Sequence, residues 1–219
     1  ENDAAICLML YTSGTTGRPK GVPRSHAAER AASLSCLAQL QYRHGEISLG
    51  VMPLFHTMGI RSLLMSAFLN GTFICMPAYN TTGALKLIGQ ENISCLFLVP
   101  TMFHDIVHRT DLNDFDLSSV TNIAYAGMSM TKALVERCAA LFPDALFSNF
   151  YGSSEIYTFA IRNYLAENPG SAGRAGIGQI LRVVRADVDE RVEPDEQVSA
   201  GKTGEIIASM NALDAFSGY

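Results

Sequence analysis

The sequence predicts an α/β fold, with a mostly parallel sheet that carries helices on both faces and leads into the start of a β-rich subdomain. Two observations predict it. Short apolar runs alternate with longer amphipathic segments up to about residue 150, as in strands joined by crossover helices. From about residue 166 the chain is rich in turns and then alternates apolar with polar residues, which is typical of antiparallel strands. We therefore place an α/β core at 1–168 and the start of the β-rich subdomain at 169–219.

The expected elements follow one another along the chain. An apolar run predicts a buried strand at 5–11, and Ser25 is a suitable N-cap for a helix at 24–40. The next elements, in order, are strand 49–53, helix 59–69, strand 72–76, helix 82–91, strand 95–99, helix 101–109, strand 123–126, helix 131–142 and strand 146–150. Pro77, Pro100 and Pro143 mark boundaries, because proline removes a backbone donor. Residues 180–189 and 205–208 predict strands of the tail.

Composition excludes several classes of protein. Lys and Arg number 16 against 21 Asp and Glu, a net charge of −5 that argues against a nucleic-acid partner. No apolar run approaches the ~20 residues of a membrane span, so we expect no stable membrane insertion. No signal peptide is visible, and we expect a cytoplasmic protein. The five cysteines are odd in number and lack C-x-x-C spacing, which predicts small buried side chains in a reducing compartment: Cys7, Cys36, Cys75, Cys95 and Cys138.

The strongest local feature is the string Y-T-S-G-T-T-G-R-P-K-G at 11–21. Glycines allow the backbone to approach a ligand closely, while hydroxyls and backbone N–H groups bind anions. Lys20 adds a positive charge at the far end, so the chemistry suits a polyphosphate. The string differs from the common nucleotide loop, in which lysine directly follows the second glycine and precedes a hydroxyl. The alternative interpretation is a flexible turn between a strand and a helix.

This string resembles the phosphate loop of the adenylate-forming superfamily, which includes acyl-CoA and aryl-CoA ligases, luciferases and the adenylation domains of peptide synthetases. Three further segments resemble the same family in the expected order: P-L-F-H-T-M-G at 53–59, A-Y-A-G-M at 124–128 and Y-G-S-S-E at 151–155. In the last of these, Ser154 replaces the usual threonine. The tail string G-K-T-G-E-I at 201–206 and the final G-Y also fit. The resemblance covers nearly the whole chain and favours the CoA-ligase branch.

The resemblance implies a two-step reaction with ATP, Mg²⁺ and CoA. A carboxylic acid and ATP form acyl-AMP and pyrophosphate, and CoA then takes the acyl group. The residues that would cradle the β- and γ-phosphates, with Lys20 nearby, are Thr12, Ser13, Gly14, Thr15, Thr16 and Gly17. Glu155 would help to hold Mg²⁺, and Ser154 would donate a hydrogen bond to the α-phosphate. Tyr151 and Gly152 would lie at the adenine, with Gly127 where the adenine and the acyl group meet.

The acyl site is less defined by the sequence. By resemblance, His56 would lie beside the carboxylate and gate the acyl channel, although a lone histidine is more often a packed or surface residue. The F-D-x-S pattern of amino-acid-activating relatives is absent, which favours a simple organic acid. Four apolar residues are candidates to line the pocket and favour a fatty or aromatic acid: Met58, Met102, Phe103 and Met128. Met102 and Phe103 are better interpreted as packing residues of a segment that can border the acyl pocket in the family. His104 and His108 share one helix face, but without an evident third ligand we interpret them as an ordinary surface rather than a zinc site.

Several parts of the family pattern lie outside this sequence. The segment before the phosphate loop, the ribose-binding aspartate and the small C-terminal domain are not present, so we expect a middle fragment that cannot complete thioester synthesis alone. Apolar faces left exposed would make homo-oligomerisation a risk. The alternatives that stay open are a non-catalytic nucleotide-binding module, an adenylate-only ligase, a luciferase-like enzyme, and a kinase-like transferase that would release ADP.

Overall fold

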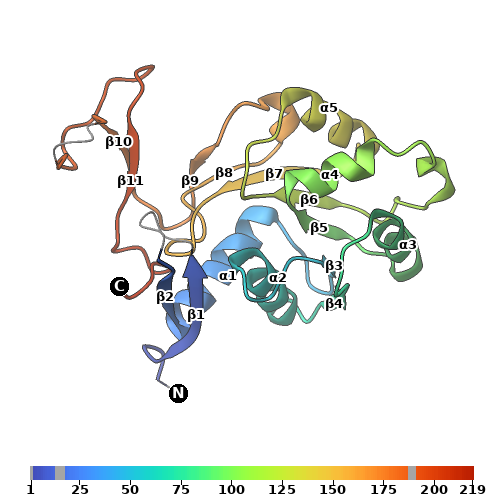
Figure 1. The fold of residues 1–219 in the computed structure, drawn as a ribbon, viewed down its shortest axis with the longest axis horizontal. Helices are drawn as coiled ribbons and strands as arrows, with labels where there is room; N and C mark the ends of the chain where they lie inside the picture. The colour runs from blue at the N-terminus through green and yellow to red at the C-terminus, as the bar shows by residue number, and fades with distance from the viewer. Residues whose placement is uncertain (1, 13–17, 187–190) are drawn as a thin grey trace.

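The computed structural model describes residues 2–12, 18–186 and 191–219, and its centre is one twisted sheet (Figure 1). The strand order is β4-β3-β5-β6-β7-β8-β9. The first five strands pair in parallel, and they are β4 (Thr72–Cys75), β3 (Ile47–Gly50), β5 (Cys95–Leu98), β6 (Asn122–Tyr125) and β7 (Leu146–Tyr151). The last two, β8 (Ala160–Arg162) and β9 (Arg174–Ala175), are antiparallel. The predicted mostly parallel α/β fold is confirmed.

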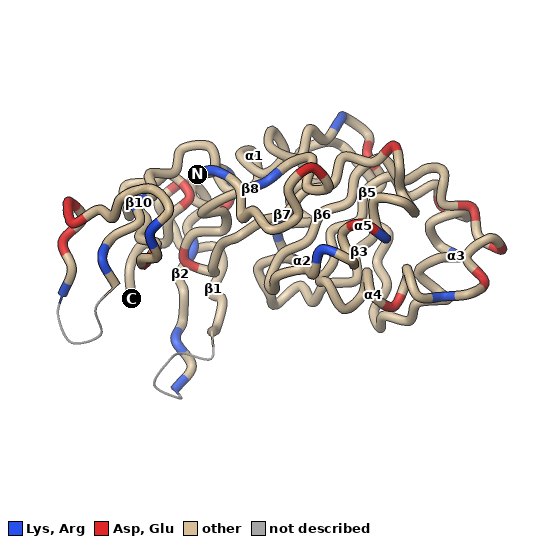
Figure 2. Tube along the Cα trace, turned by 90° about the horizontal axis from the view of Figure 1, so that it is seen from above, with Lys and Arg blue, Asp and Glu red and all other residues tan. Residues whose placement is uncertain are grey.

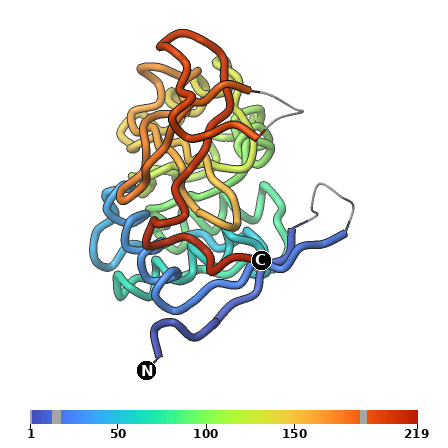
Figure 3. Tube along the Cα trace, turned by 90° about the vertical axis from the view of Figure 1, so that its left-hand side faces the viewer, coloured from blue at the N-terminus to red at the C-terminus, as the bar shows by residue number. Residues whose placement is uncertain are grey.

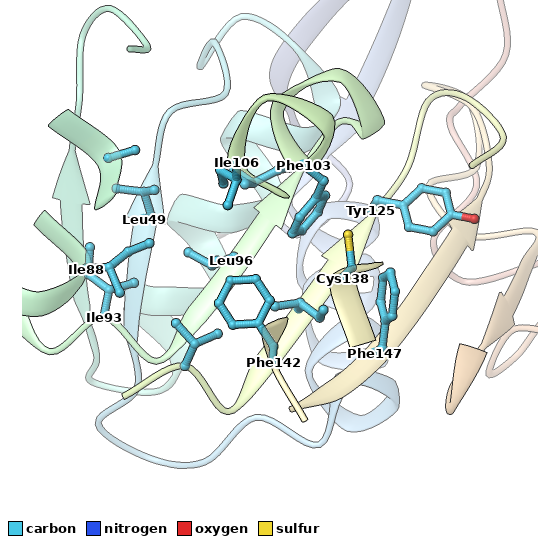
Figure 4. Packing of buried hydrophobic residues seen from close by; sticks show 14 of the residues in the cluster. Leu49, Ile88, Ile93, Leu96, Phe103, Ile106, Tyr125, Cys138, Phe142 and Phe147 are labelled. Carbon is cyan, nitrogen blue, oxygen red and sulfur yellow. The ribbon is translucent and has the colours of Figure 1, made fainter. Parts of the chain in front are cut away.

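Helices cover both faces of this sheet (Figure 1). One face carries α3 (Thr81–Glu91), α4 (Pro100–Val107) and α5 (Lys132–Leu141), and the other carries α1 (His26–Leu40) and α2 (Thr57–Phe68). Successive side chains of a strand point to opposite faces. Leu96 and Leu98 therefore enter the α3–α5 core while Phe97 enters the α1–α2 core. Figure 4 shows the larger core, where Phe103 of α4 packs with its ring centre 6.3 Å from that of Phe147.

A separate antiparallel hairpin, β1 (Ile6–Thr12) with β2 (Lys20–Ser25), stands beside the sheet. The predicted strand at 5–11 exists, but the prediction that it is buried is wrong. Leu10 is buried, whereas Ile6 is 48% and Tyr11 71% exposed. The reason is that β1 pairs only with β2 and joins no larger sheet. β2 itself was not predicted, because its sequence K-G-V-P-R-S contains the two residues that strands disfavour most; an edge position tolerates them.

The tail forms a second antiparallel ribbon, β10 (Leu181–Val184) with β11 (Glu205–Ala208), as the sequence predicted. Two short 3₁₀ helices, η1 (Leu112–Asp114) and η2 (Leu165–Glu167), lie in the connections. Because β9 follows residue 168 and still pairs with β8, the main sheet continues past the expected boundary between 1–168 and 169–219. That boundary stays a prediction. Within the described residues, no helix has the length and hydropathy needed to cross a membrane.

The cysteines depart from expectation at two positions. All five lie in the described part of the chain, and none forms a disulfide. Cys36, Cys95 and Cys138 are buried as predicted, and burial raises the pKa of the Cys138 thiol to about 12. Cys7 and Cys75 are exposed, so the prediction that they are buried is wrong. The cause is that Cys75 ends the edge strand β4 and Cys7 belongs to the two-stranded hairpin.

Replacing the N-cap of α1 is expected to destabilise the fold. Ser25 has extended backbone geometry, and its Oγ accepts a hydrogen bond from the Ala28 backbone N–H at 3.2 Å. Ser25→Ala should lower the free energy of unfolding by about 1 kcal/mol, because one N–H of the first turn loses its acceptor. Ser35→Ala, inside the same helix, should leave stability unchanged or raise it, because alanine favours helix interiors. Urea unfolding of both variants checks the opposite signs, and equal losses would contradict the assignment of the cap.

Candidate active site

The predicted motifs converge at the carboxyl edge of the parallel strands, where ligands of open α/β sheets usually bind. The segments after β3, β6 and β7 enclose a cavity of about 170 Å³. Residues that line it include His56, Thr57, Arg61, Gly127, Gly152 and Ser154. Four of these were predicted as site residues from the sequence. Segments separated by about a hundred residues thus meet at one cavity.

Two glycines shape the wall of this cavity. Gly127 follows β6 with φ of +90°, a conformation that favours glycine. Gly152 follows β7, and a Cβ there would lie 2.2 Å from the backbone oxygen of Tyr157. Any side chain at 152 would therefore displace the turn 152–157. The backbone of both segments lies open to the cavity where a flat ligand could approach it.

His56 and Thr57 enter the cavity from the start of α2. His56 is exposed and forms the N-cap of the helix, since its Nδ1 accepts a hydrogen bond of 3.4 Å from the Met58 N–H. Thr57 Oγ1 lies 3.1 Å from Ser154 Oγ, so this hydrogen bond joins the start of α2 to the turn after β7. Thr57 was not predicted; the hydroxyl directly after a candidate histidine was the available signal. That His56 gates an acyl channel stays a prediction.

Glu155 points toward the end of the hairpin and not into the cavity. Its carboxylate accepts a hydrogen bond from the Tyr219 hydroxyl. Lys20, the first residue of β2, places its Nζ 5.2 Å from the centre of the Tyr219 ring. Burial opposes ionisation of Glu155, but hydrogen bonds from Tyr219 and Ser153 and the charge of Lys20 outweigh it and hold its pKa below the usual value. A carboxylate and an ammonium group therefore lie together beside the cavity.

The hairpin brings its loop end to this carboxylate. Thr12 pairs with Lys20, so the element that begins at Lys20 is a strand and not a helix. Figure 2 shows basic residues gathered at this end, and Figure 3 shows the C-terminal residues beside the hairpin. The predicted phosphate-binding residues Ser13, Gly14, Thr15, Thr16 and Gly17 lie outside the described residues. Their role stays a prediction, as does that of Thr12.

Tyr151 ends β7 at the same edge but does not line the cavity. It is 44% exposed, and its ring meets that of Phe159 edge-on, with the centres 5.5 Å apart. An exposed aromatic face beside Gly152 is compatible with stacking against a flat base. The prediction that it contacts an adenine is untested.

Arg61 is a site residue that the sequence interpretation missed. It lies on α2, lines the cavity and is 1% exposed. Its Nη1 donates to the backbone oxygen of Tyr157 and to Thr158 Oγ1, both at 3.2 Å, and its guanidinium lies 4.9 Å from the centre of the Phe97 ring. An arginine in the apolar run T-M-G-I-R-S-L-L-M was the signal, because buried cations need polar or aromatic partners.

Of the four apolar candidates for lining the pocket, Met58 alone does so. Phe103 is fully buried in the α3–α5 core, so its interpretation as a packing residue is confirmed and it does not line this cavity. Met102 packs against the same core, and Met128 is 66% exposed. The physical reason is that α4 uses its apolar face to cover the sheet and leaves the cavity to α2.

The donor set fits Mg²⁺ bound together with a polyphosphate. Mg²⁺ usually keeps several waters and takes one or two carboxylates plus phosphate oxygens. Glu155 supplies one ionised carboxylate beside Lys20. No group of three or more His, Cys, Asp or Glu side chains that could hold a metal occurs among residues 2–12, 18–186 and 191–219. His104 of α4 and its C-cap residue His108 are both exposed, with their ring centres 4.1 Å apart, and belong to no such group.

The comparisons with known proteins agree with this arrangement. The whole chain, residues 1–219, matches the family described as "AMP-binding enzyme", and the protein belongs to that family. It is 31% identical over 192 residues, 84% of its length, to a 4-chlorobenzoate–CoA ligase of Pseudomonas sp. (strain CBS-3), of which this covers 35%. It is 33% identical over 156 residues, 70% of its length, to a 2-succinylbenzoate–CoA ligase of Arabidopsis thaliana, of which this covers 28%. The chain thus spans about a third of the length of these relatives.

A solved structure shares the fold over almost the whole chain. The N-terminal domain of FACL13 from Mycobacterium tuberculosis, crystallised with an inhibitor, superimposes with a TM-score of 0.82 at 25% identity. The match covers 96% of this chain and 51% of that one. The resemblance seen in the sequence motifs, including the CoA-ligase branch, is confirmed.

Proposed function

We propose that this chain belongs to an enzyme that activates an aromatic carboxylic acid with ATP and transfers it to CoA. One observation carries the proposal. Lys20 and Glu155 both contact Tyr219 at the hairpin end, and Ser154, the neighbour of Glu155, lines the cavity at the carboxyl edge of the sheet. Cation and carboxylate suit a metal–triphosphate complex, while the neighbouring cavity suits the acid. The relatives named for 4-chlorobenzoate and 2-succinylbenzoate support an aryl acid over a fatty one.

The first half-reaction needs positioning and charge neutralisation more than covalent help from the protein. A carboxylate oxygen of the acid attacks the α-phosphorus, an O–P bond forms, and the bond to the bridging oxygen breaks as pyrophosphate leaves with the electron pair. Lys20 faces the charge that develops on pyrophosphate. Ser154 and Thr57 offer hydroxyl groups to the α-phosphate at the cavity wall. Mg²⁺, held in part by Glu155, neutralises phosphate charge when it is bound.

The second half-reaction replaces AMP by a thiol. The sulfur of CoA attacks the acyl carbon, a C–S bond forms, the C–O bond to AMP breaks, and the thiol proton is lost to solvent. Gly127 leaves the wall open at the place where the acyl carbon would be attacked. His56 at the cavity rim would lie beside that carbon.

Carboxylate-dependent exchange of label between ATP and pyrophosphate tests the proposal. The assay uses the longest reading frame that contains this chain, with substituted benzoates and cinnamates set against straight-chain fatty acids. Exchange with an aryl acid is the expected result. Exchange with fatty acids only would correct the substrate class. Binding of ATP without exchange for any acid would refute the activity and favour a nucleotide-binding module.

A further inference from the structure

The hairpin carries a buried arginine that the proposed reaction does not use. Arg24 lies on β2, four residues after Lys20, and its side chain is completely buried. Its Nε forms an ion pair with Glu29 Oε1 of α1 at 2.6 Å. Its guanidinium carbon lies 4.0 Å from the centre of the Tyr157 ring. One side chain therefore connects the hairpin, the first helix and the turn after β7.

The most specific contact of Arg24 is with Glu155. Nη1 of Arg24 donates to the backbone oxygen of Glu155 at 2.9 Å and to that of Asp214 at 2.7 Å. The Phe216 N–H donates to the same Glu155 oxygen at 2.8 Å. Two donors from distant parts of the chain thus fix the backbone of Glu155, while its side chain turns to Lys20 and Tyr219. Charge-assisted hydrogen bonds of this kind are stronger than neutral ones.

The network is poorly explained by stability alone. Burying an ion pair costs desolvation that the attraction between the charges often does not recover. Within the described part of the chain, Nη2 of Arg24 has no hydrogen-bond partner, so the pairing is incomplete. Apolar side chains in place of both Arg24 and Glu29 would pack beside Tyr157 at lower cost. What an apolar side chain could not do is hold the Glu155 carbonyl at a fixed place relative to the strand that begins at Lys20.

We propose that Arg24 is a positioning residue that locks the backbone of Glu155 to the hairpin, so that the Glu155 carboxylate and Lys20 face the same metal–triphosphate complex. The inference rests on the proposed function, because it assigns Glu155 a role toward the metal. It goes beyond the roles of Lys20 and Glu155, since Arg24 itself touches no substrate in this arrangement.

The test compares Arg24→Lys with Arg109→Lys. Arg109 is a matched control far from the site, because it also pairs with a carboxylate (Asp111), donates to a hydroxyl (Thr82) and lies over a ring, that of Phe115. The first readout is binding of Mn²⁺–ATP, followed by the relaxation of water protons, in the longest reading frame that contains this chain. The second is the Mg²⁺ concentration for half-maximal ATP–pyrophosphate exchange, and melting temperatures are recorded in parallel.

Arg24→Lys should weaken Mn²⁺–ATP binding about tenfold and raise the half-maximal Mg²⁺ concentration by a similar factor, as is typical when a group that orients a ligating carboxylate is lost. Arg109→Lys should change neither value. If Arg24→Lys fails to fold, Glu29→Gln takes its place, because it keeps Arg24 but removes its ionic partner. Glu29→Gln should bind Mn²⁺–ATP more weakly than its control Asp111→Asn.

The inference would be overturned if Arg24→Lys and Arg109→Lys bound Mn²⁺–ATP with equal affinity. When Arg24→Lys does not fold, equal affinities of Glu29→Gln and Asp111→Asn would overturn it. The Mn²⁺–ATP binding measurement tests the role of Arg24 separately from the proposed activity. Wild-type protein that binds Mn²⁺–ATP but catalyses no exchange would refute the activity and still decide the role of Arg24. Wild-type protein that does not bind Mn²⁺–ATP would overturn both.

Discussion

Lys20→Ala is expected to lower ATP–pyrophosphate exchange about 10²- to 10³-fold, the loss that follows removal of one preorganised charge or donor at a reacting centre. Lys20 begins β2 at the loop end of the hairpin, and its ammonium group lies near Glu155 and the Tyr219 ring. The charge is most useful when the leaving pyrophosphate gains negative charge. The maximal rate should therefore fall more than the affinity for ATP, and steady-state exchange kinetics at varied ATP measure both.

Lys132→Ala is the matched control for this variant. Lys132 is an exposed lysine at the start of α5, paired only loosely with Glu136. It should leave exchange within the error of the assay. Exchange by Lys20→Ala at the level of Lys132→Ala would show that the cation beside Glu155 does not act on the reaction.

Glu155→Gln should reduce exchange by a similar factor of about 10²–10³ at fixed Mg²⁺. Glutamine keeps the length of the side chain and can still accept the hydrogen bond from Tyr219, so the main change is the loss of one negative charge. Because a carboxylate is the ligand that Mg²⁺ prefers, part of the lost rate should return at higher Mg²⁺ concentration. A titration of exchange against Mg²⁺ measures this recovery.

Glu136→Gln, on the exposed face of α5, serves as the control for charge removal alone. Its Mg²⁺ titration should coincide with that of the wild type. A Glu155→Gln enzyme with a wild-type Mg²⁺ requirement would remove Glu155 from the metal site, and it would also remove the basis for the role of Arg24.

The sequence predicts most of the sheet because its strands are short apolar runs bounded by proline or turn residues. The helices follow from the longer amphipathic segments between these strands, and Ser25 caps α1 as expected. The hairpin was harder to predict, since the burial of β1 depends on how many strands pair with it and not on its own hydropathy. β2 carries Gly21 and Pro23, so local propensity argued against a strand that pairing with β1 nevertheless forms.

The sequence predicts the site residues that belong to a motif, but not those whose position depends on packing. His56, Gly127, Gly152 and Ser154 line one cavity because each follows a strand of the same sheet. Phe103 has the same apolar character as Met58, but it belongs to a helix on the other face. Arg24 and Arg61 were missed because the backbone oxygens that connect them to the turn after β7, those of Glu155 and Tyr157, lie about a hundred residues or more along the chain.

The central claim, activation of a carboxylic acid as acyl-AMP, is tested most directly by following the oxygen atoms of the acid. An aryl acid labelled with ¹⁸O in its carboxylate is incubated with ATP, Mg²⁺ and hydroxylamine, which takes the acyl group in place of CoA. The phosphorus products are then analysed by mass spectrometry. The account predicts one labelled oxygen in AMP, because the attacking carboxylate oxygen stays on the α-phosphorus when the C–O bond breaks. Label in inorganic phosphate, with ADP as the nucleotide product, would contradict it.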